Sequence, residues 1–353
     1  MKNHFFQSFF LAISLFLIFP SNLIISSSNA HESLDHRLPF TTEQAEKARI
    51  FNTVSKLISE SKFDEIETLA AKYRNTNERS PSGLWNLTHF YESLGRYWNS
   101  TDKLYSPEET QKRRNVFFNS WRQKYPNSPT PYLAQVVLHR SFAWKTRGWG
   151  YTNTVKKEAW APFFKHIKIA RNLLDKHKKI ASLDPHWYKL RIRIGVELGE
   201  SKDSILTNIF EGINKTPNYY PIYFAAVAFF SPMWNGDEAK IASLADLAVK
   251  LTEKNEGQSL YARIYWAAIQ GRDGNLVFFS PTMSWDRMKK GMDDVVARYP
   301  DHWNINNFLY FSCVRADKPQ VQKLFKMMEG EPLLKVWGKK ELFEECKRFA
   351  MTK

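Results

Sequence analysis

Apolar residues recur every three or four positions through most of the chain, the spacing of one face of an α-helix. Thr41 and Thr42 are capping residues before the first such stretch, whose apolar positions include Ile50, Val54 and Ile58. The spacing predicts further helices over 63–73, 84–97, 132–144, 159–180, 187–198, 204–213, 220–230, 239–251, 260–269, 285–297, 305–314 and 320–328. The one strand-like run, 276–279, is short and lies beside Pro281, which favours a loop packed on the core. The pattern therefore predicts an all-α fold.

Prolines separate these stretches in four similar settings, and another apolar run follows each within a few residues: Tyr125-Pro126-Asn127, Asp184-Pro185-His186, Thr216-Pro217-Asn218 and Tyr299-Pro300-Asp301. Proline cannot continue a helix, and Asn or Asp accepts hydrogen bonds from the free amides of the next helix. We interpret these sites as helix-to-helix corners. A chain divided in this way predicts stacked helical hairpins like those of tetratricopeptide repeats.

Parts of a tetratricopeptide repeat accompany the corners. The string Tyr91-x-x-Leu94-Gly95-x-x-Trp98 is similar to the start of such a repeat, W-x-x-L-G-x-x-Y, in which the glycine lets two helices approach closely. Pro185 and Pro217 are 32 residues apart, close to the roughly 34 residues of one repeat, whereas the other intervals are 59 and 83 residues. This spacing predicts an irregular tetratricopeptide-like αα superhelix with extra helices and loops in the long intervals.

The first 30 residues have the composition of a secretory signal peptide. Lys2 precedes an apolar run of about eleven residues, and Ser28 and Ala30 fit the small-residue cleavage rule. The run is shorter than the roughly twenty residues that span a bilayer; the alternative is an uncleaved anchor that includes 23–25. We predict a signal peptide over 1–30 and a single helical-repeat-like domain over 31–353, with 31–40 disordered, in a protein exported to the periplasm or secreted.

The chain is basic, with 51 Lys and Arg against 36 Asp and Glu, and its net charge is +15. A basic surface attracts polyanions, but export, the spread of cations along the helices and the lack of an RNA-binding or zinc-finger motif argue against nucleic acid. No apolar run after the leader is long enough to cross a membrane. The expected partner is an unknown protein, a peptide or an anionic envelope polymer, with membrane contact only through an uncleaved leader.

Cys313 and Cys346 are the only cysteines of the chain. In an oxidising compartment an even pair predicts one disulfide, which closes a loop of about thirty residues and contributes about 3 to 4 kcal/mol. The alternative is two buried free thiols, because cysteine also serves as a small core residue. The sequence has no CxxC motif, which argues against disulfide chemistry as the function.

Motifs of catalysis and metal binding are hard to find. The chain has 9 histidines but no HExxH, and His166 and His177 have basic neighbours that repel a cation. Ser59-x-x-Lys62 and Ser100-x-x-Lys103 match a penicillin-binding nucleophile pattern, but its SDN and KTG companions are missing. We predict no catalytic residue, no metal site and no cofactor, and enzymatic activity stays an open question.

The segment 142–151, Phe-Ala-Trp-Lys-Thr-Arg-Gly-Trp-Gly-Tyr, differs from the rest of the chain. Its two glycines free the backbone to turn, so Arg147, Trp149 and Tyr151 are expected on a loop between two helices. Arginine and aromatic side chains dominate binding hot spots, which makes these three the candidate partner-binding residues. The alternative is that the loop folds back and its tryptophans fill the core.

Several strings together resemble an uncharacterised bacterial family, the domain of unknown function 4034, from about Phe63 to the C-terminus. The strings are Phe63-Asp64-Glu65, Ser82-Gly83-Leu84-Trp85, Ala143-Trp144-Lys145-x-Arg147-Gly148-x-Gly150-Tyr151, Pro217-x-Tyr219-Tyr220-Pro221-x-Tyr223-Phe224, Tyr261-Ala262-Arg263-Ile264-Tyr265-Trp266 and Tyr299-Pro300-Asp301. The resemblance implies a tetratricopeptide-like helical domain, often in exported or membrane-associated proteins, with no assigned activity. It marks Arg147-Gly148 and the corner at 219–223 as family features.

These observations favour an exported helical scaffold or interaction protein that binds a peptide, a protein or an envelope component. The alternative is a cell-envelope enzyme or carbohydrate-binding module that uses the segment from Trp144 to Tyr151. A third class, a secreted factor that acts on a host cell, requires only the leader. The sequence does not identify the partner.

Overall fold

A computed structural model describes residues 42–101, 104–150, 152–231, 236–269 and 274–352 of the chain. These ranges are helical and contain no strand; their only β feature is an isolated antiparallel bridge between Arg79 and Trp85. The predicted all-α fold of helical hairpins is therefore confirmed. The predicted signal peptide, 1–30, and the predicted disordered segment, 31–40, lie outside the described residues.

Contacts divide the chain into two compact units, residues 46–295 and residues 1–45 together with 296–353. The single domain expected over 31–353 stays a prediction. Up to the end of the larger unit the helices are α2 (Thr42–Ser59), α3 (Phe63–Asn75), α4 (Asn86–Thr101), α5 (Pro107–Lys124), α6 (Thr130–Arg147), α7 (Trp160–Lys176), α8 (Lys178–Ala181), α9 (His186–Leu198), α10 (Lys202–Lys215), α11 (Pro221–Phe230), α12 (Glu238–Glu256), α13 (Ser259–Ile269) and α14 (Trp285–Arg298). Short 3₁₀ helices cover Thr152–Thr154, Lys157–Ala159 and Gly274–Phe279.

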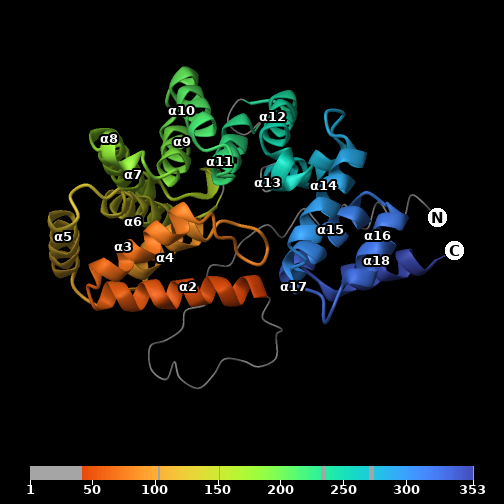
Figure 1. Ribbon diagram of the computed structural model, residues 1–353, viewed down its shortest axis with the longest axis horizontal. Helices are drawn as coiled ribbons and strands as arrows, with labels where there is room; N and C mark the ends of the chain where they lie inside the picture. The colour runs from red at the N-terminus through yellow and green to blue at the C-terminus, as the bar shows by residue number, and fades with distance from the viewer. Residues whose placement is uncertain (1–41, 102–103, 151, 232–235, 270–273, 353) are drawn as a thin grey trace. The chain divides into compact units, whose positions relative to one another are not determined.

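Helices that follow one another in the larger unit pack side by side. Helix α6 packs on α7, α9 on α10 and α12 on α13, while α4 packs on α6 and α9 on α11 (Figure 1). Helices α4 and α6 come close because Gly95 has no side chain: a Cβ there would lie 2.8 Å from Val137 Cγ1 and 3.2 Å from Ser141 Cβ. The glycine of the string Tyr91 to Trp98 thus has the close-packing role that its motif predicts.

All four proline corners connect two helices. Two of the corners contain the same kind of hydrogen bond, made by a tyrosine six residues after the proline: Tyr132 after Pro126 and Tyr223 after Pro217. Each hydroxyl donates to the carbonyl oxygen of its proline, over 3.1 and 2.9 Å respectively. The entries to α6 and α11 are therefore built alike, which indicates that the two hairpins repeat one local design.

A buried carboxylate holds the corner before α9. Asp184 has no exposed surface, and its Oδ1 accepts a hydrogen bond from the backbone amide of His186 over 2.8 Å. Its Oδ2 accepts from the Tyr91 hydroxyl of α4 over 2.7 Å and from Arg74 Nε of α3 over 2.8 Å. One side chain therefore caps α9 and ties it to α3 and α4, and the arginine supplies the charge that makes its burial tolerable.

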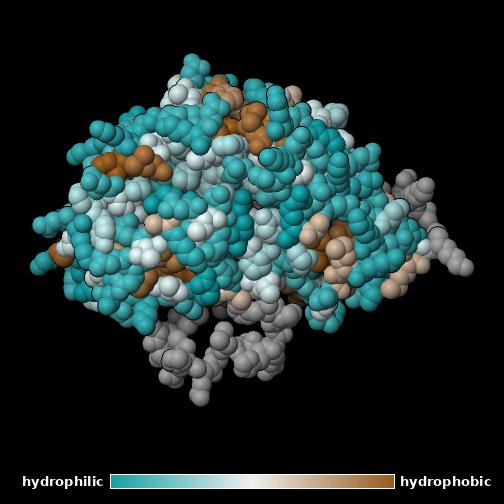
Figure 2. Space-filling model, in the orientation of Figure 1, coloured by the Kyte–Doolittle hydropathy of each residue, from teal (hydrophilic) through white to brown (hydrophobic). Residues whose placement is uncertain are grey.

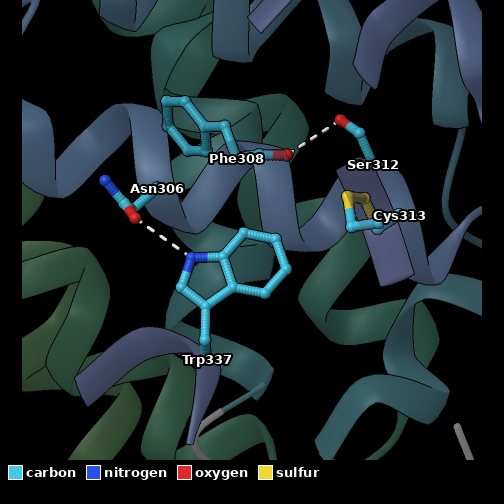
Figure 3. Close-up of a disulfide and its surroundings, with 6 residues drawn as sticks. Asn306, Phe308, Ser312, Cys313 and Trp337 are labelled. Atoms are coloured by element: carbon cyan, nitrogen blue, oxygen red, sulfur yellow. Dashed lines mark hydrogen bonds between the residues drawn. A yellow bond between two sulfur atoms is a disulfide. The ribbon is translucent and has the colours of Figure 1, made fainter. Parts of the chain in front are cut away.

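The smaller unit contains α15 (His302–Val314), α16 (Lys318–Met327), α17 (Leu334–Trp337) and α18 (Lys340–Met351). Cys313 of α15 and Cys346 of α18 form a disulfide with Cα atoms 5.8 Å apart, within the normal range for a disulfide, as predicted. Figure 3 shows the adjacent contact, in which the buried indole of Trp337 donates through Nε1 to Asn306 Oδ1 over 3.0 Å. The disulfide and the indole join α15 to α18 and α17.

Several boundaries differ from the predicted ones. Helix α6 continues to Arg147 instead of ending at Trp144, and the predicted helix 159–180 is divided at His177 into α7 and α8. Helix α18 has no predicted counterpart, and α5 is predicted only as the helix that ends at the Pro126 corner, without a start. In the first half of α5 the buried positions include Thr110 and Arg114, which the hydrophobic pattern does not show, whereas its second half buries Phe117, Phe118 and Trp121.

The strand-like run 276–279 lies in the 3₁₀ helix Gly274–Phe279, where Val277 and Phe278 are buried, so this run does pack on the core as expected. Hydrophilic residues cover most of the face drawn in Figure 2, and hydrophobic residues gather on it in small separate patches. No helix within the described ranges combines the length and the apolar character that a membrane span requires.

Candidate functional site

The segment expected to be a loop, 142–151, is helical up to Arg147. Gly148 follows as the C-cap with φ +77°, and its amide donates to the carbonyl oxygen of Trp144 over 2.8 Å. A positive φ favours glycine, so this glycine ends the helix. Arg147 is therefore the last residue of α6 and not a loop residue, because the helix continues until the first position that needs a glycine.

The Arg147 guanidinium lies among aromatic rings. It is 5.0 Å from the ring centroid of Trp144, 4.7 Å from that of Trp160 and 5.9 Å from that of Phe163. Its Nη1 also donates to the carbonyl oxygens of the two glycines of the segment, over 2.9 and 3.1 Å. Burial lowers the pKa of Arg147, and Glu197 acts in the opposite direction. These contacts hold the segment against α6 and α7, so the arginine has a packing role.

Trp149 is the exposed aromatic residue among the described residues of the segment. Its side chain is 64% exposed, and its ring stacks on that of Trp144 with centroids 4.7 Å apart and planes 14° from parallel. The stack fixes the orientation of the exposed indole without burying it. Tyr151, the third candidate residue, lies outside the described residues. Of the three predicted binding residues, Trp149 presents an open aromatic face and Arg147 supports it.

A buried ion pair joins this stack to α9. Trp144 Nε1 donates to Glu197 Oε1 over 2.9 Å, and Arg140 donates to the same carboxylate through Nη2 at 2.6 Å and Nε at 3.0 and 3.2 Å. The Glu197 side chain is 3% exposed and that of Arg140 is 21% exposed. Bidentate arginine–carboxylate pairs are the strong, directional kind of ion pair. The pair therefore fixes both the α6–α9 contact and the position of the Trp144 ring.

Helix α9 leaves one narrow strip uncovered. Of its residues from 186 to 198, only Lys189, Arg193 and Leu198 are not buried. Lys189 and Arg193 are four residues apart, so they lie on one face of the helix, one turn before Glu197. Lys189 Nζ lies 3.4 Å from Glu92 Oε1 of α4, whose side chain is 60% exposed. We call the surface formed by Glu92, Arg140, Trp144, Lys189, Arg193 and Glu197 the α4–α6–α9 face.

Arg193 differs from its neighbours on this face because it makes no hydrogen bond or ion pair with any described residue. Burial lowers its pKa, the nearby charge of Arg140 lowers it further, and Glu197 acts in the opposite direction. Burial likewise lowers the pKa of Lys189, against the effect of Glu92. The protein thus holds two partly buried cations one helical turn apart, and one of them has no ion-pair partner among the described residues.

The electrostatics of Glu92 complete this picture. Burial works to raise its pKa, but Lys189, His89 and Lys47 outweigh it and the pKa is lowered overall. The carboxylate is therefore ionised at neutral pH. The face accordingly presents three cations and two carboxylates, an arrangement of mixed charge with one unpaired guanidinium.

Two histidines that are distant in sequence meet between α6 and α7. His139 Nδ1 lies 3.1 Å from His166 Nδ1, and burial lowers the pKa of His139 to about 4 with a further contribution from His166. Burial also lowers the pKa of His166. Within the described ranges, no group of three or more His, Cys, Asp or Glu side chains is arranged to hold a metal ion. His177 lies elsewhere, stacked on Tyr132 with centroids 4.3 Å apart.

Sequence reasoning missed Arg140, Lys189, Arg193 and Glu197. The available signal was the alternation of Lys189, Arg191 and Arg193 in an otherwise apolar stretch. Arg191 is buried and paired with Asp175 and Glu200 at 3.0 and 2.8 Å, so similar residues of one string have different roles.

Comparisons with protein-family models, with curated proteins and with solved structures found no match for this chain. The resemblance to the domain of unknown function 4034 therefore stays a prediction.

Proposed function

We propose that the protein is an exported helical interaction protein that binds a segment of another protein on the α4–α6–α9 face and on Trp149. The observation that carries the proposal is the stacked, exposed indole of Trp149 beside that face. An aromatic side chain that is already held in place loses little conformational freedom when a partner covers it. Aromatic and arginine side chains that lie together are also the usual composition of interface hot spots.

The hairpin architecture supports this proposal. Helix α9 leaves a strip with Lys189 and Arg193 uncovered, and α4 leaves a wider strip uncovered that includes Glu92 and Arg96. The contact between Lys189 and Glu92 shows that the two strips adjoin. Side-by-side helices that each leave one strip free offer a continuous surface to a partner, which is how helical-repeat proteins bind.

Export and a tetratricopeptide-like relationship are part of the same proposal. The disulfide between Cys313 and Cys346 supports export, because such bonds persist in oxidising compartments. The basic net charge supports a partner with acidic groups.

The second candidate is a carbohydrate-binding module or enzyme of the cell envelope. The specific observation in its favour is again the Trp149 indole, because an open, oriented aromatic ring can also pack against the apolar face of a sugar. The two candidates predict different ligands for the same side chain.

The test is affinity capture from the envelope fraction of the source organism, with the wild-type protein, Trp149→Ala and Phe210→Ala. Phe210 of α10 is a matched control because it is a large aromatic side chain that is 49% exposed and lies outside the α4–α6–α9 face. We expect Trp149→Ala to recover the partner about tenfold less well and Phe210→Ala to recover it normally. Equal recovery by all three proteins would refute the role of Trp149. Release of the protein by soluble envelope oligosaccharides, with no protein captured, would favour the second candidate.

A further inference from the structure

The unpaired guanidinium of Arg193 is the feature of the α4–α6–α9 face that the fold does not explain. Arg140 is paired with Glu197 through Nε and Nη2, and Lys189 is paired with Glu92. Arg193 has five N–H donors, and none of them is used by a described residue. A cation held near two others without an ion pair of its own costs free energy, so its presence indicates a role outside the folding of the chain.

The chemistry of these donors selects an oxygen anion. A planar guanidinium matches the two oxygens of a carboxylate, and the ammonium of Lys189, one turn away, has donors left for the same group. The incoming charge would also relieve the repulsion among Arg140, Lys189 and Arg193, because neighbouring cations, beside burial, lower the pKa of Lys189 and of Arg193. An anion therefore gains more here than it would from an isolated surface lysine.

Because the face carries carboxylates as well as cations, it should bind a ligand with a single carboxylate better than a dense polyanion. Glu92 and Glu197 flank the cations, each beside one of them. A polyphosphate or a nucleic acid would bring further negative charges against these two carboxylates, and like charges at short range repel. One carboxylate on an otherwise neutral segment meets Arg193 and Lys189 without that cost.

The distance to the aromatic stack sets the spacing of the ligand. Arg193 and Glu197 are one helical turn apart, Glu197 accepts from Trp144, and Trp144 stacks on Trp149. With the side chains of Glu197 and Trp144 included, this path is roughly 20 Å long; the straight line from Arg193 to Trp149 is shorter, so about five residues of extended peptide can span it.

We propose that Arg193, with Lys189, binds a carboxylate of a peptide segment whose aromatic or apolar side chain, within about five residues of that carboxylate, packs on Trp149. This inference rests on the proposed function and adds the chemical class of the ligand. It identifies the partner segment by an acidic residue, or a free C-terminus, next to a large apolar residue.

The experiment is selection from a random library of displayed peptides of about twelve residues against three full-length mature proteins: wild type, Arg193→Gln and Arg113→Gln. Arg113 is the control because it is an exposed arginine of α5, outside the α4–α6–α9 face. Circular dichroism and thermal melting verify that each variant folds. The best wild-type peptide is then titrated in its selected form and with its acidic residue changed to the amide, or its C-terminus amidated. Trigalacturonic acid and inorganic polyphosphate are titrated in parallel.

We expect wild type and Arg113→Gln to enrich peptides with a carboxylate close to an aromatic or apolar residue, and Arg193→Gln to lose this preference. Amidation should weaken binding about 10-fold to 100-fold on wild type and much less on Arg193→Gln. Peptides without an acidic preference, or the same preference with Arg193→Gln, would overturn the carboxylate site but leave peptide binding standing. Recovery of no peptide would overturn both proposals. If only trigalacturonic acid or polyphosphate bound, and bound through Arg193, the anion at this site would not come from a peptide and the peptide proposal would be overturned.

Discussion

Two neighbouring substitutions on α9 should have opposite effects on stability. Glu197→Gln removes the charge from a carboxylate that is 3% exposed and that accepts from Arg140 at 2.6, 3.0 and 3.2 Å and from Trp144 at 2.9 Å. Arg193→Gln, one turn earlier, removes a charge that pairs with no described residue. Both changes put the same neutral side chain on the same strip of the same helix, so each controls for the other.

The structure gives the magnitude and the sign of each effect. Breaking one side of a buried ion pair costs about 3 to 5 kcal/mol, and because Gln can still accept one of these hydrogen bonds we expect Glu197→Gln to lower the free energy of unfolding by about 3 kcal/mol. Arg140 would then lie beside Arg193 and Lys189 with no counter-charge. Arg193→Gln removes repulsion and desolvation of an unpaired cation, so its free energy of unfolding should be unchanged or higher by up to about 1 kcal/mol.

Urea denaturation followed by circular dichroism at pH 7 measures both values, provided that the slope against urea concentration stays the same. Added salt should reduce the increase in the free energy of unfolding caused by Arg193→Gln, because screening weakens the repulsion that the substitution removes. The reasoning is refuted if Arg193→Gln destabilises the protein as much as Glu197→Gln does, since Arg193 would then have a structural partner.

Three further predictions concern other parts of the chain. Arg147→Ala should lower the free energy of unfolding by about 1 to 2 kcal/mol in thermal or urea melts, because it removes the cation–π and carbonyl contacts of the segment after α6; an unchanged stability would show that Arg147 does not pack. Mass spectrometry without reduction should find Cys313 linked to Cys346, and replacement of both by serine should cost about 4 kcal/mol for the sequence separation of 33; two alkylatable thiols in the native protein would contradict the bond. Burial lowers the pKa of His139 to about 4, so between about pH 6.5 and 4 this side chain stays neutral in the folded protein but takes up a proton in the unfolded chain. The free energy of unfolding should therefore fall as the pH drops through this range, and His139→Gln should make it fall less steeply. An equally steep fall in His139→Gln would rule this group out.

The sequence predicts the corners and the fold class well because their causes are local. A proline ends a helix whatever surrounds it, and all four corners lie between helices. The role of Gly95 could also be predicted, because its motif requires a glycine where two helices approach closely, and the structure places Gly95 against Val137. The cysteine pairing is equally simple to predict, because the chain has only two cysteines.

The α4–α6–α9 face could not be predicted because it depends on which helices cover α9. Arg191 and Arg193 look alike in sequence, yet Asp175 and Glu200 reach only the first of them. The same applies to the segment after α6, where Arg147 and Trp149 share one motif but one packs inward and the other stays 64% exposed. Local pattern predicts the helices, whereas tertiary packing decides which of their polar residues stay available.

The most direct test of the central claim is photo-crosslinking at Trp149 in living cells of the source organism. Position 149 carries benzoyl-phenylalanine in one protein, and Phe210 on α10 carries it in the control, so that both replacements exchange one exposed aromatic side chain for another. We expect a discrete adduct with one partner protein at position 149, absent at position 210 and suppressed by an excess of unlabelled wild-type protein. The same adducts at both positions, or none at position 149 when the protein is folded and exported, would contradict it.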